Sequence, residues 1–126
     1  MYKRQFIASR LRDKGHEVRV LPVATWARVA IDVAQAVAGG DADQGIVCCW
    51  TGTGVAMAAN KVAGVRAALC VDAQTAAGAR KWNDANVLAF GLRLSSPAVV
   101  REMIEAFLQA EPDETELPVI SRVERQ

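Results

Sequence analysis

The stretch that decides the fold is GIVCCWTGTGVAMAANKVAG, residues 45–64. It begins with a short apolar run that ends in two cysteines, passes through a turn with two glycines, and continues with small residues typical of a helix. A strand, a turn and a helix in this order form the repeating unit of parallel sheets that carry helices on both faces. Ligands of such sheets bind beyond the carboxyl ends of strands, so we expect a binding site at residues 50–54.

Four runs in the chain have the composition of strands: residues 17–21 (EVRVL), 45–49 (GIVCC), 66–71 (RAALCV) and 86–91 (NVLAFG). The last three are apolar almost throughout, as expected of parallel strands that are covered on both faces. Helical stretches lie between them, so the pattern predicts a three-layer α/β/α, Rossmann-like parallel sheet. Because the chain opens on a helix where such folds usually open on a strand, we expect residues 17–21 to lie beside a gap in the sheet.

Capping residues mark the ends of the predicted helices. Thr25, Asp72 and Ser96 each precede a helical pattern and can accept hydrogen bonds from N–H groups of the first turn. Gly15 is placed to end the first helix. Apolar positions three and four residues apart predict that the helix after Thr25 has a buried inner face consisting of Trp26, Val29, Ala30, Val33 and Val37.

Length and composition limit the class of protein. The 126 residues are enough for one domain, which we place at residues 1–110, followed by an acidic and then basic tail at 111–126. The formal net charge is +1 and no long basic stretch occurs, so a nucleic-acid partner is not expected. No apolar run is long enough for a membrane span, and the N-terminus lacks the apolar core of a signal peptide. Three cysteines in no disulfide or zinc pattern favour a reduced, cytoplasmic protein.

The thiol of Cys49 is the candidate reactive group. It ends a predicted strand, and Gly52 and Gly54 in the following turn permit positive φ angles, so that backbone N–H groups can converge on an anion. The N-terminal end of the next helix adds its dipole, which favours a thiolate near neutral pH. Thr51 adds a hydroxyl that can donate or accept a hydrogen bond. The sequence therefore predicts a thiolate beside an anion-binding cradle.

Several chemistries use a thiol and an anion cradle, and residue spacing separates them. A phosphatase loop of the C-x5-R type requires arginine at Val55 or Gly54, which excludes it. A papain-like nucleophile needs a histidine, but the single one, His16, lies in a predicted turn before the first predicted strand. A dinucleotide-binding fingerprint stays open: Met57 stands where a third small residue is usual, although Asp72 lies at a suitable distance for a ribose contact.

Burial is the plainer interpretation of a cysteine in an apolar run. Cys70 lies within a predicted strand, and Cys48 points to the opposite face from Cys49 because side chains alternate along a strand. We expect Cys48 and Cys70 to be small core residues, and burial is also the alternative for Cys49.

The runs AANKVAGVRAALC and NDANVLAFG, within residues 45–93, resemble the type B ribose-5-phosphate isomerases and the related galactose-6-phosphate isomerase subunits. The resemblance extends over residues 6–109. It implies an enzyme of carbohydrate metabolism, in the pentose phosphate pathway, that interconverts an aldose phosphate and a ketose phosphate through a cis-enediolate. The resemblance further implies that no metal or other cofactor takes part, and that the protein forms homodimers or homotetramers.

The same resemblance assigns roles to residues around the glycine turn. Cys49 matches the base that moves a proton between C1 and C2, and Thr51 matches a threonine that helps to open the sugar ring. The loop that stabilises the enediolate oxygens matches the backbone of Gly52, Thr53 and Gly54.

Two further residues match substrate-binding positions of the family. Asn83, in the NDAN motif, matches an asparagine that holds the reacting end of the substrate. Arg122 resembles a phosphate-binding arginine of the C-terminal tail, which in this family reaches across a subunit interface. The resemblance therefore implies that Arg122 serves the pocket of the neighbouring subunit.

Four differences from the family pattern bear on the substrate. The family's first strand, which ends in an Asp-His pair on the sugar phosphate, has no counterpart, as in a product truncated at its N-terminus. Trp50 replaces a glycine after the base, Trp82 stands where many members carry a ring-opening histidine, and Trp26 lies in the region of a sugar-facing tyrosine. We expect the two loop-facing tryptophans to narrow the pocket and to favour a short or open-chain substrate such as a tetrose phosphate. The alternatives are a sugar-phosphate-binding protein without catalysis, or one subunit of a hetero-oligomeric isomerase.

Overall fold

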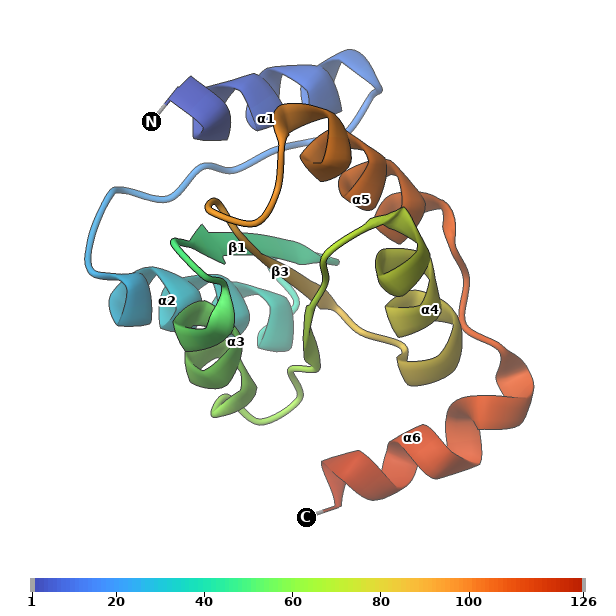
Figure 1. Cartoon of the computed structure of the whole chain (residues 1–126). Coiled ribbons are helices and arrows are strands. Elements are labelled where there is room, and N and C mark those ends of the chain that lie inside the picture. The colour runs from blue at the N-terminus through green and yellow to red at the C-terminus, as the bar shows by residue number, and fades with distance from the viewer. Residues whose placement is uncertain (1, 126) are drawn as a thin grey trace.

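In the computed structural model, which describes residues 2–125, helices and strands alternate from β1 to α5, as the sequence predicts (Figure 1). The elements are α1 (Tyr2–Asp13), α2 (Trp26–Ala38), β1 (Gly45–Cys49), α3 (Thr53–Asn60), β2 (Ala67–Leu69), α4 (Ala73–Asn83), β3 (Val87–Gly91), α5 (Pro97–Gln109), the 3₁₀-helix η1 (Glu114–Glu116) and α6 (Leu117–Glu124).

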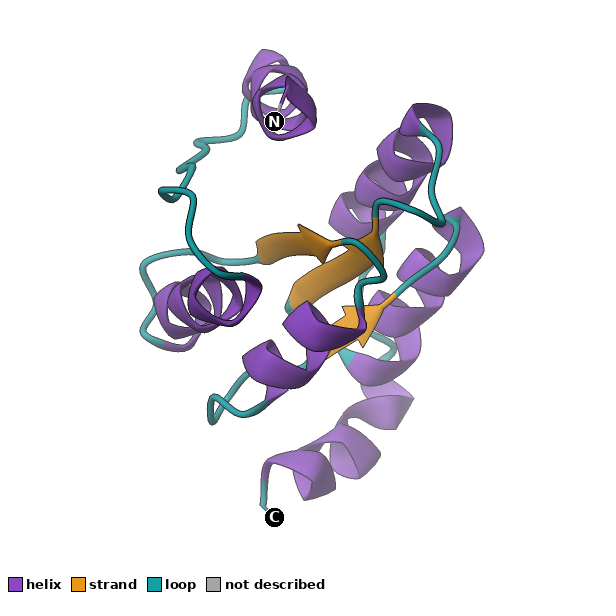
Figure 2. Ribbon diagram, turned by 60° about the vertical axis from the view of Figure 1, so that its left-hand side comes forward, coloured by secondary structure: helices purple, strands orange, loops and turns teal. Residues whose placement is uncertain are grey.

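The sheet has three parallel strands in the order β1-β3-β2. Residues 45–49 lie opposite residues 87–91, and residues 67–69 lie opposite residues 87–89. α2 and α3 cover one face of the sheet and α4 and α5 cover the other, which gives three layers (Figures 1 and 2). The predicted α/β/α fold is confirmed, and the register brings the carboxyl ends of β1 and β3 together at one end of the sheet.

Alternation of side chains along the strands divides the core into two apolar clusters, one on each face. Leu88 and Phe90 of β3 pack with the buried side chains of α4 and α5. Val87 and Ala89 pack on the other face, with those of α2 and α3. Because β3 is buried along its whole length, its sequence is apolar at every position rather than at every second one.

The predicted strand at residues 17–21 is wrong, because the structure has an irregular loop there. A strand needs a neighbour that accepts and donates main-chain hydrogen bonds, and no strand in residues 2–125 pairs with this segment. Arginine side chains of α1 take over part of that role. Arg4 donates to the Leu21 carbonyl oxygen at 2.8 Å, and Arg12 donates to the Val18 carbonyl oxygen at 3.0 Å.

The predicted burial of Trp26 is also wrong, because 54% of this residue is exposed. Trp26 is the first residue of α2, and the indole lies at the end of the helix rather than over the sheet. The fully buried residues of α2 are Ala30 and Ala34, whose small side chains let the helix pack closely against the sheet and α3. The tryptophan is therefore available to the surface around the β1–α3 turn.

The predicted caps are confirmed. The side chains of Thr25, Asp72 and Ser96 each accept a hydrogen bond from a first-turn N–H group of α2, α4 and α5, respectively. Asp72 also takes part in a reciprocal capping box with Thr75. These side chains set the directions in which the helices leave the ends of the strands.

The outer side of β2 carries a side-chain contact in place of a strand. The Asn60 side chain, at the end of α3, accepts a hydrogen bond from the Ala67 N–H at 2.7 Å and donates one to the Ala67 carbonyl oxygen at 2.9 Å. Pairing with β3 uses main-chain groups of other residues. The Cys70 N–H donates to the Ala89 carbonyl oxygen, and the Asn86 N–H donates to the Arg66 carbonyl oxygen. Asn60 therefore satisfies both main-chain groups of the first residue of β2.

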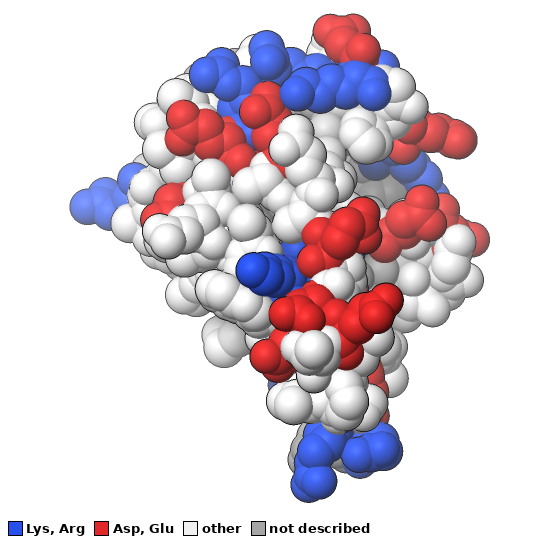
Figure 3. Space-filling model, turned by 90° about the vertical axis from the view of Figure 1, so that its right-hand side faces the viewer, with Lys and Arg blue, Asp and Glu red and all other residues white. Residues whose placement is uncertain are grey.

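The tail crosses the C-terminal end of α4 and ends in α6. The Asp113 N–H donates to the Lys81 carbonyl oxygen at 2.8 Å, and Ile120 is the buried side chain of α6. Figure 3 shows acidic side chains gathered over the middle of this side of the molecule and basic ones at its lower end, which follows the charge order of the tail. Within the described residues, no helix combines the length and the apolar character needed to cross a bilayer.

Candidate active site

Cys49 is the last residue of β1 and lies at the carboxyl end of the sheet. Its side chain is partly exposed, and its sulfur accepts a hydrogen bond from the Gly52 N–H at 3.2 Å. A main-chain N–H directed at sulfur stabilises negative charge on it. The hydrogen bond therefore holds the thiol over the turn, where the sequence predicted a reactive group.

Gly52 makes the turn possible because no other residue fits there. Its φ angle is +83°, and a Cβ atom would lie 2.8 Å from the Phe90 carbonyl carbon and 2.9 Å from the Gly91 nitrogen. Both are main-chain atoms of β3 that cannot move without breaking the strand. The turn consequently lies directly against the end of the central strand.

The N-terminal turn of α3 opens beside the Cys49 sulfur. Gly52 is the N-cap and offers no side-chain acceptor, and the first helical hydrogen bond runs from the Ala56 N–H to the Gly52 carbonyl oxygen. The N–H groups of Thr53, Gly54 and Val55 precede that bond, so they have no carbonyl partner one turn earlier in the helix. N–H groups of this kind can receive an anion, and the helix dipole adds positive potential at the same place.

Thr51 and Thr53 place two hydroxyl groups at the mouth of the turn. Both residues are exposed, and their Oγ1 atoms lie 3.0 Å apart, within hydrogen-bonding distance. Either hydroxyl can donate to the other or to a bound oxygen. The pair adds proton-bearing groups next to the anion cradle.

Gly54 serves a different purpose from the one that the sequence predicted. It lies in the first turn of α3 and its φ is not positive. A Cβ atom at this position would lie 2.9 Å from the Trp26 ring, so the absence of a side chain lets the indole rest against the helix. Trp50, which is 63% exposed, follows Cys49 directly. Two aromatic side chains thus border the turn.

Arg93 is a candidate residue that the sequence analysis missed. Its backbone N–H donates to the Trp50 carbonyl oxygen at 2.9 Å, and the Leu92 N–H donates to the Cys49 carbonyl oxygen at 2.9 Å. These bonds place the exposed Arg93 beside the turn, and in the described part of the chain no carboxylate pairs with it. A guanidinium near an anion cradle suits a phosphate. The sequence did contain a signal for Arg93, because it follows the end of a predicted strand. The same rule, that ligands bind beyond the carboxyl ends of parallel strands, pointed to Cys49.

The other cysteines have no part in this arrangement. Burial raises the pKa of the Cys70 thiol, and its sulfur lies 3.6 Å from the Ala68 carbonyl oxygen, to which it donates. Cys48 packs against the cluster formed with α4 and α5, whereas Cys49 packs against the cluster of the opposite face. The predicted alternation of the two adjacent cysteines is therefore confirmed, as is the burial of Cys70.

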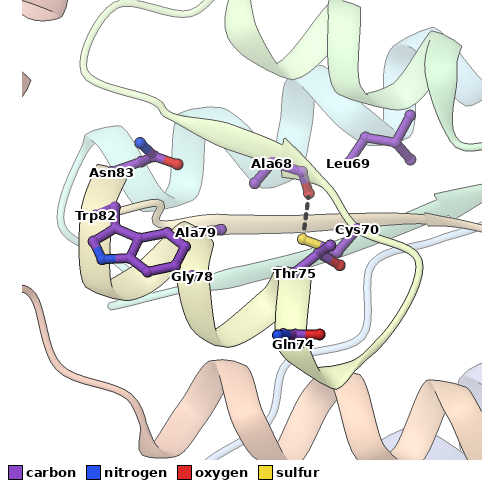
Figure 4. A pocket seen from close by; sticks show the side chains of 9 residues that line it. All are labelled: Ala68, Leu69, Cys70, Gln74, Thr75, Gly78, Ala79, Trp82 and Asn83. Carbon is purple, nitrogen blue, oxygen red and sulfur yellow. Dashed lines mark hydrogen bonds between the residues drawn. The ribbon is translucent and has the colours of Figure 1, made fainter.

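Asn83 lies at a different place in the molecule. It is the last residue of α4 and lines a groove of about 390 Å³ between β2 and α4 (Figure 4). Trp82 lies in the same groove. Its ring covers Gly78, 2.7 Å from the position that a Cβ atom on Gly78 would occupy. Cys49 does not line this groove. Trp82 therefore does not face the β1–α3 turn of its own chain, so the tryptophans beside that turn are Trp50 and Trp26.

The distance between Asn83 and Cys49 follows from the length of β3. Asn83 precedes β3, whereas Cys49 lies opposite Gly91, the last residue of β3. Residues in a strand rise by about 3.3 Å each, so the five residues of β3 separate the two ends by at least about 13 Å. Arg122 is exposed on α6, and α6 approaches the amino end of the sheet through Glu124, which pairs with Arg66 just before β2. The predicted site residues thus form two groups at opposite ends of the sheet.

Comparison with known proteins identifies the family. A family model described as Ribose/Galactose Isomerase matches residues 1–124. Ribose-5-phosphate isomerase B of Escherichia coli K12 is 40% identical over 112 residues, which cover 83% of this chain and 74% of that protein. D-erythrulose-4-phosphate isomerase of Pectobacterium atrosepticum is 46% identical over 83 residues, which cover 66% of this chain and 55% of that protein.

A solved structure agrees with the sequence relatives. Ribose-5-phosphate isomerase B of Clostridium thermocellum superposes with a TM-score of 0.94 at 32% identity, over 98% of this chain and 88% of that one. The family model covers nearly the whole chain, and the structural likeness extends over the same residues. The chain therefore belongs to the ribose/galactose isomerase family of sugar-phosphate isomerases.

Proposed function

We propose that this chain is an aldose–ketose isomerase of a sugar phosphate and that Cys49 is the base that moves a proton between C1 and C2. The observation that carries the proposal is the hydrogen bond from the Gly52 N–H to the Cys49 sulfur, 3.2 Å long, next to the open first turn of α3. The reaction needs a base near a carbon atom and donors near the adjacent oxygen. One loop supplies both.

The proposed chemistry uses the thiolate twice. In the direction from aldose to ketose, the sulfur removes the proton from C2, and the electron pair forms a C1–C2 double bond as the carbonyl oxygen on C1 takes up charge. The resulting cis-enediolate receives that proton from sulfur at C1, while the hydroxyl proton on the C2 oxygen passes to the C1 oxygen, so that C2 becomes the carbonyl and C1 the alcohol. The N–H groups of Thr53 and Gly54 stabilise the enediolate oxygens, and one such donor contributes about 3 kcal/mol to the transition state.

Thr51 and Arg93 contribute to the proposed site from the same chain as Cys49. The exposed Thr51 hydroxyl exchanges protons with the sugar oxygens, which assists ring opening when the substrate arrives as a ring. The Arg93 guanidinium attracts the phosphate to the carboxyl end of the sheet. These residues turn an anion cradle into a site for a phosphorylated sugar.

A tetrose phosphate is the substrate that we favour, with ribose 5-phosphate as the alternative. Trp26 rests against Gly54 and Trp50 is exposed beside Cys49, so two large side chains border the place where a sugar would lie. A tetrose phosphate cannot close a ring through the oxygen that carries its phosphate, so it needs no ring-opening group. The similarity to a D-erythrulose-4-phosphate isomerase supports the same choice.

We further propose that the site is completed by a second copy of the chain in a homodimer. Asn83 and Arg122 lie at the amino end of the sheet, too far from Cys49 to contact the same small molecule. A two-fold arrangement resolves this, because each copy then offers its amino end to the carboxyl end of its partner. Asn83 would hold the reacting end of the sugar and Arg122 its phosphate.

Solvent exchange during turnover tests the proposal. We expect the wild-type protein in D2O to place deuterium at C1 of D-erythrulose 4-phosphate, and to do so faster than at C1 of ribulose 5-phosphate. Cys49→Ala should abolish the exchange, whereas Cys48→Ala, which removes the adjacent thiol on the other face, should retain it. Exchange that survives in Cys49→Ala would exclude this residue as the base, and faster exchange with the pentose would reject the tetrose.

The same experiment separates catalysis from simple binding. A wild-type protein whose melting temperature rises with either sugar phosphate, but which exchanges no deuterium, is a binding protein rather than an isomerase. Exchange that appears only after a second, different chain is added would identify one subunit of a hetero-oligomer.

A further inference from the structure

Arg66 lies directly before β2 and binds groups from several other segments. Its Nε donates to the Asp84 carbonyl oxygen at 2.8 Å, and its Nη2 lies 3.4 Å from the Asp84 carboxylate. Its Nη1 forms an ion pair with Glu124 of α6. Its backbone N–H donates to the Asn86 side chain at 2.7 Å. Only 19% of the Arg66 side chain is exposed, so these contacts are shielded from water on most sides.

Asp84 is the residue that ends α4 and follows Asn83 in the chain. Its φ angle of +47° is left-handed, a conformation that is uncommon for a residue with a Cβ atom. The carboxylate also accepts a hydrogen bond from Arg80 at 3.0 Å. Two guanidinium groups therefore hold the turn from which Asn83 projects.

Glu124 is the last residue of α6 and lies two residues after Arg122 in the same helical turn. Ile120 is the one side chain of α6 that is buried, so the helix has little apolar contact with the rest of the chain. The ion pair with Arg66 fixes the end of α6 that carries Arg122. A single arginine thus connects the two residues that lie far from Cys49.

We propose that Arg66 is a positioning residue, which keeps Asn83 and Arg122 in one arrangement by binding Asp84 and Glu124 at the same time. The inference rests on the proposed function, because it takes Asn83 and Arg122 as residues that bind the substrate. An arginine suits this task, since its planar guanidinium offers donors in a fixed geometry to two partners. A lysine ammonium is a point charge and does not reproduce that geometry.

Four variants of the full-length protein isolate the contacts. Glu124→Gln removes the carboxylate that anchors α6. Asp84→Asn removes the other carboxylate, yet asparagine tolerates the left-handed backbone. Arg66→Lys keeps the positive charge but loses the planar set of donors that binds two carboxylates at once. Glu105→Gln is the matched control, because it breaks a different ion pair, between α5 and Lys14 in the turn after α1, at a distance of 3.0 Å.

Two measurements read out the effect. The first is amide hydrogen exchange over residues 111–125 by mass spectrometry, which needs no substrate. We expect Glu124→Gln and Arg66→Lys to speed it by about fivefold, as the loss of one partly exposed ion pair implies. The second is steady-state kinetics, in which KM should rise by a similar factor while kcat changes by less than about twofold, because the substrate is bound less well before the chemistry.

The outcomes separate this inference from the proposed function. The inference would be overturned if Glu124→Gln left amide exchange and KM unchanged, or if Arg66→Lys kept the wild-type values of both. An effect of Glu105→Gln equal to that of Glu124→Gln would overturn it as well. Asp84→Asn should raise KM without loosening α6, and a variant that loosens α6 instead would contradict the division of roles. If the wild-type protein turns over neither sugar phosphate, the proposed function fails, and the exchange rates alone decide whether Arg66 holds α6.

Discussion

The two ends of the sheet hold the two groups of candidate residues, and they are built by different means. At the carboxyl end, the main chain sets the positions: Gly52 has no room for a side chain, and its N–H holds the Cys49 sulfur. At the amino end, charged side chains set them, with Arg66 binding Asp84 and Glu124. A rigid main chain tolerates almost no substitution, whereas a side-chain network loses one contact at a time. Substitutions in the Gly52 turn should therefore affect folding and chemistry together, and those in the Arg66 network should mainly weaken substrate binding and the attachment of α6.

The largest effect is expected for Gly52→Ala. The new Cβ would meet main-chain atoms of β3 at under 3 Å and the residue would keep a positive φ angle. We expect a loss of about 3 kcal/mol in the free energy of unfolding, from overpacking and backbone strain combined. Urea titration measures it.

Gly40→Ala is the matched control for that substitution. Gly40 also has a positive φ, +85°, but nothing lies within 4 Å of the position of its Cβ. It should lose only about 1 kcal/mol, the cost of the left-handed backbone. Equal losses at both glycines would show that the contact with β3 does not restrict the turn.

Mixing two inactive variants tests whether the two ends meet between copies. Cys49→Ala and Asn83→Ala lie at opposite ends of the sheet and should each be inactive alone. If one site takes Cys49 from one copy and Asn83 from its partner, random mixing restores about a quarter of the wild-type activity, since half of the dimers then contain one intact site of two. An assay after mixing and unfolding–refolding measures this. Activity that stays at zero would mean that both residues act within one chain, and activity of either variant alone would mean that the residue it lacks is not needed.

Gly54 and Trp26 should behave as a coupled pair. Gly54→Ala places a methyl group against the Trp26 ring and should destabilise the protein by about 1 kcal/mol, because the exposed indole can give way. Trp26→Ala removes the obstacle, so the double variant should be more stable than the sum of the two single losses predicts. A double-mutant cycle by urea unfolding measures the coupling. In the same cycle with Trp50→Ala in place of Trp26→Ala, the two losses should be additive. Coupling between Gly54 and Trp50 would mean that Trp50, rather than Trp26, lies against α3.

The smallest effect is expected at the ion pair between Lys14, directly after α1, and Glu105 of α5. A hydrogen bond from Lys14 lowers the pKa of the Glu105 carboxyl, so the pair adds stability above the unfolded pKa and loses it as the pH falls through the folded value. The side chains are exposed, so the gain is small and screened by salt. Melting temperatures of wild type and Glu105→Gln should differ slightly near neutral pH and converge in acid. A difference that persists in acid would point to a contact other than the ion pair.

Local patterns in the sequence predicted most of the fold. Thr25, Asp72 and Ser96 mark helix starts because a cap depends only on neighbouring residues. The apolar strands at 45–49 and 86–91 are recognisable because burial on both faces leaves no polar position. The segment 17–21 has the same local preference, but a strand also needs a partner, and that condition lies outside its own sequence.

The arrangement of the site was less accessible from the sequence. The turn beside Cys49 follows from one continuous stretch, so its geometry could be anticipated, including the left-handed Gly52. Arg93 reaches the turn only through the parallel register of two distant strands, and Trp26 only because Gly54 leaves space for it. That Asn83 lies at the other end of the sheet follows from the parallel topology, because a helix that joins two parallel strands runs back toward their amino ends. The contacts of Arg66 join segments far apart in the chain.

The amide of Asn60 has a consequence for the solubility of the molecule. It forms hydrogen bonds with the main-chain N–H and carbonyl groups of Ala67, which could otherwise pair with a strand of another molecule. Since β2 spans only Ala67–Leu69, blocking its first residue leaves too short a template for edge-to-edge growth into ribbons. Copies of the chain that approach on this flank must therefore associate through side chains, which permits a closed assembly and discourages an open-ended one.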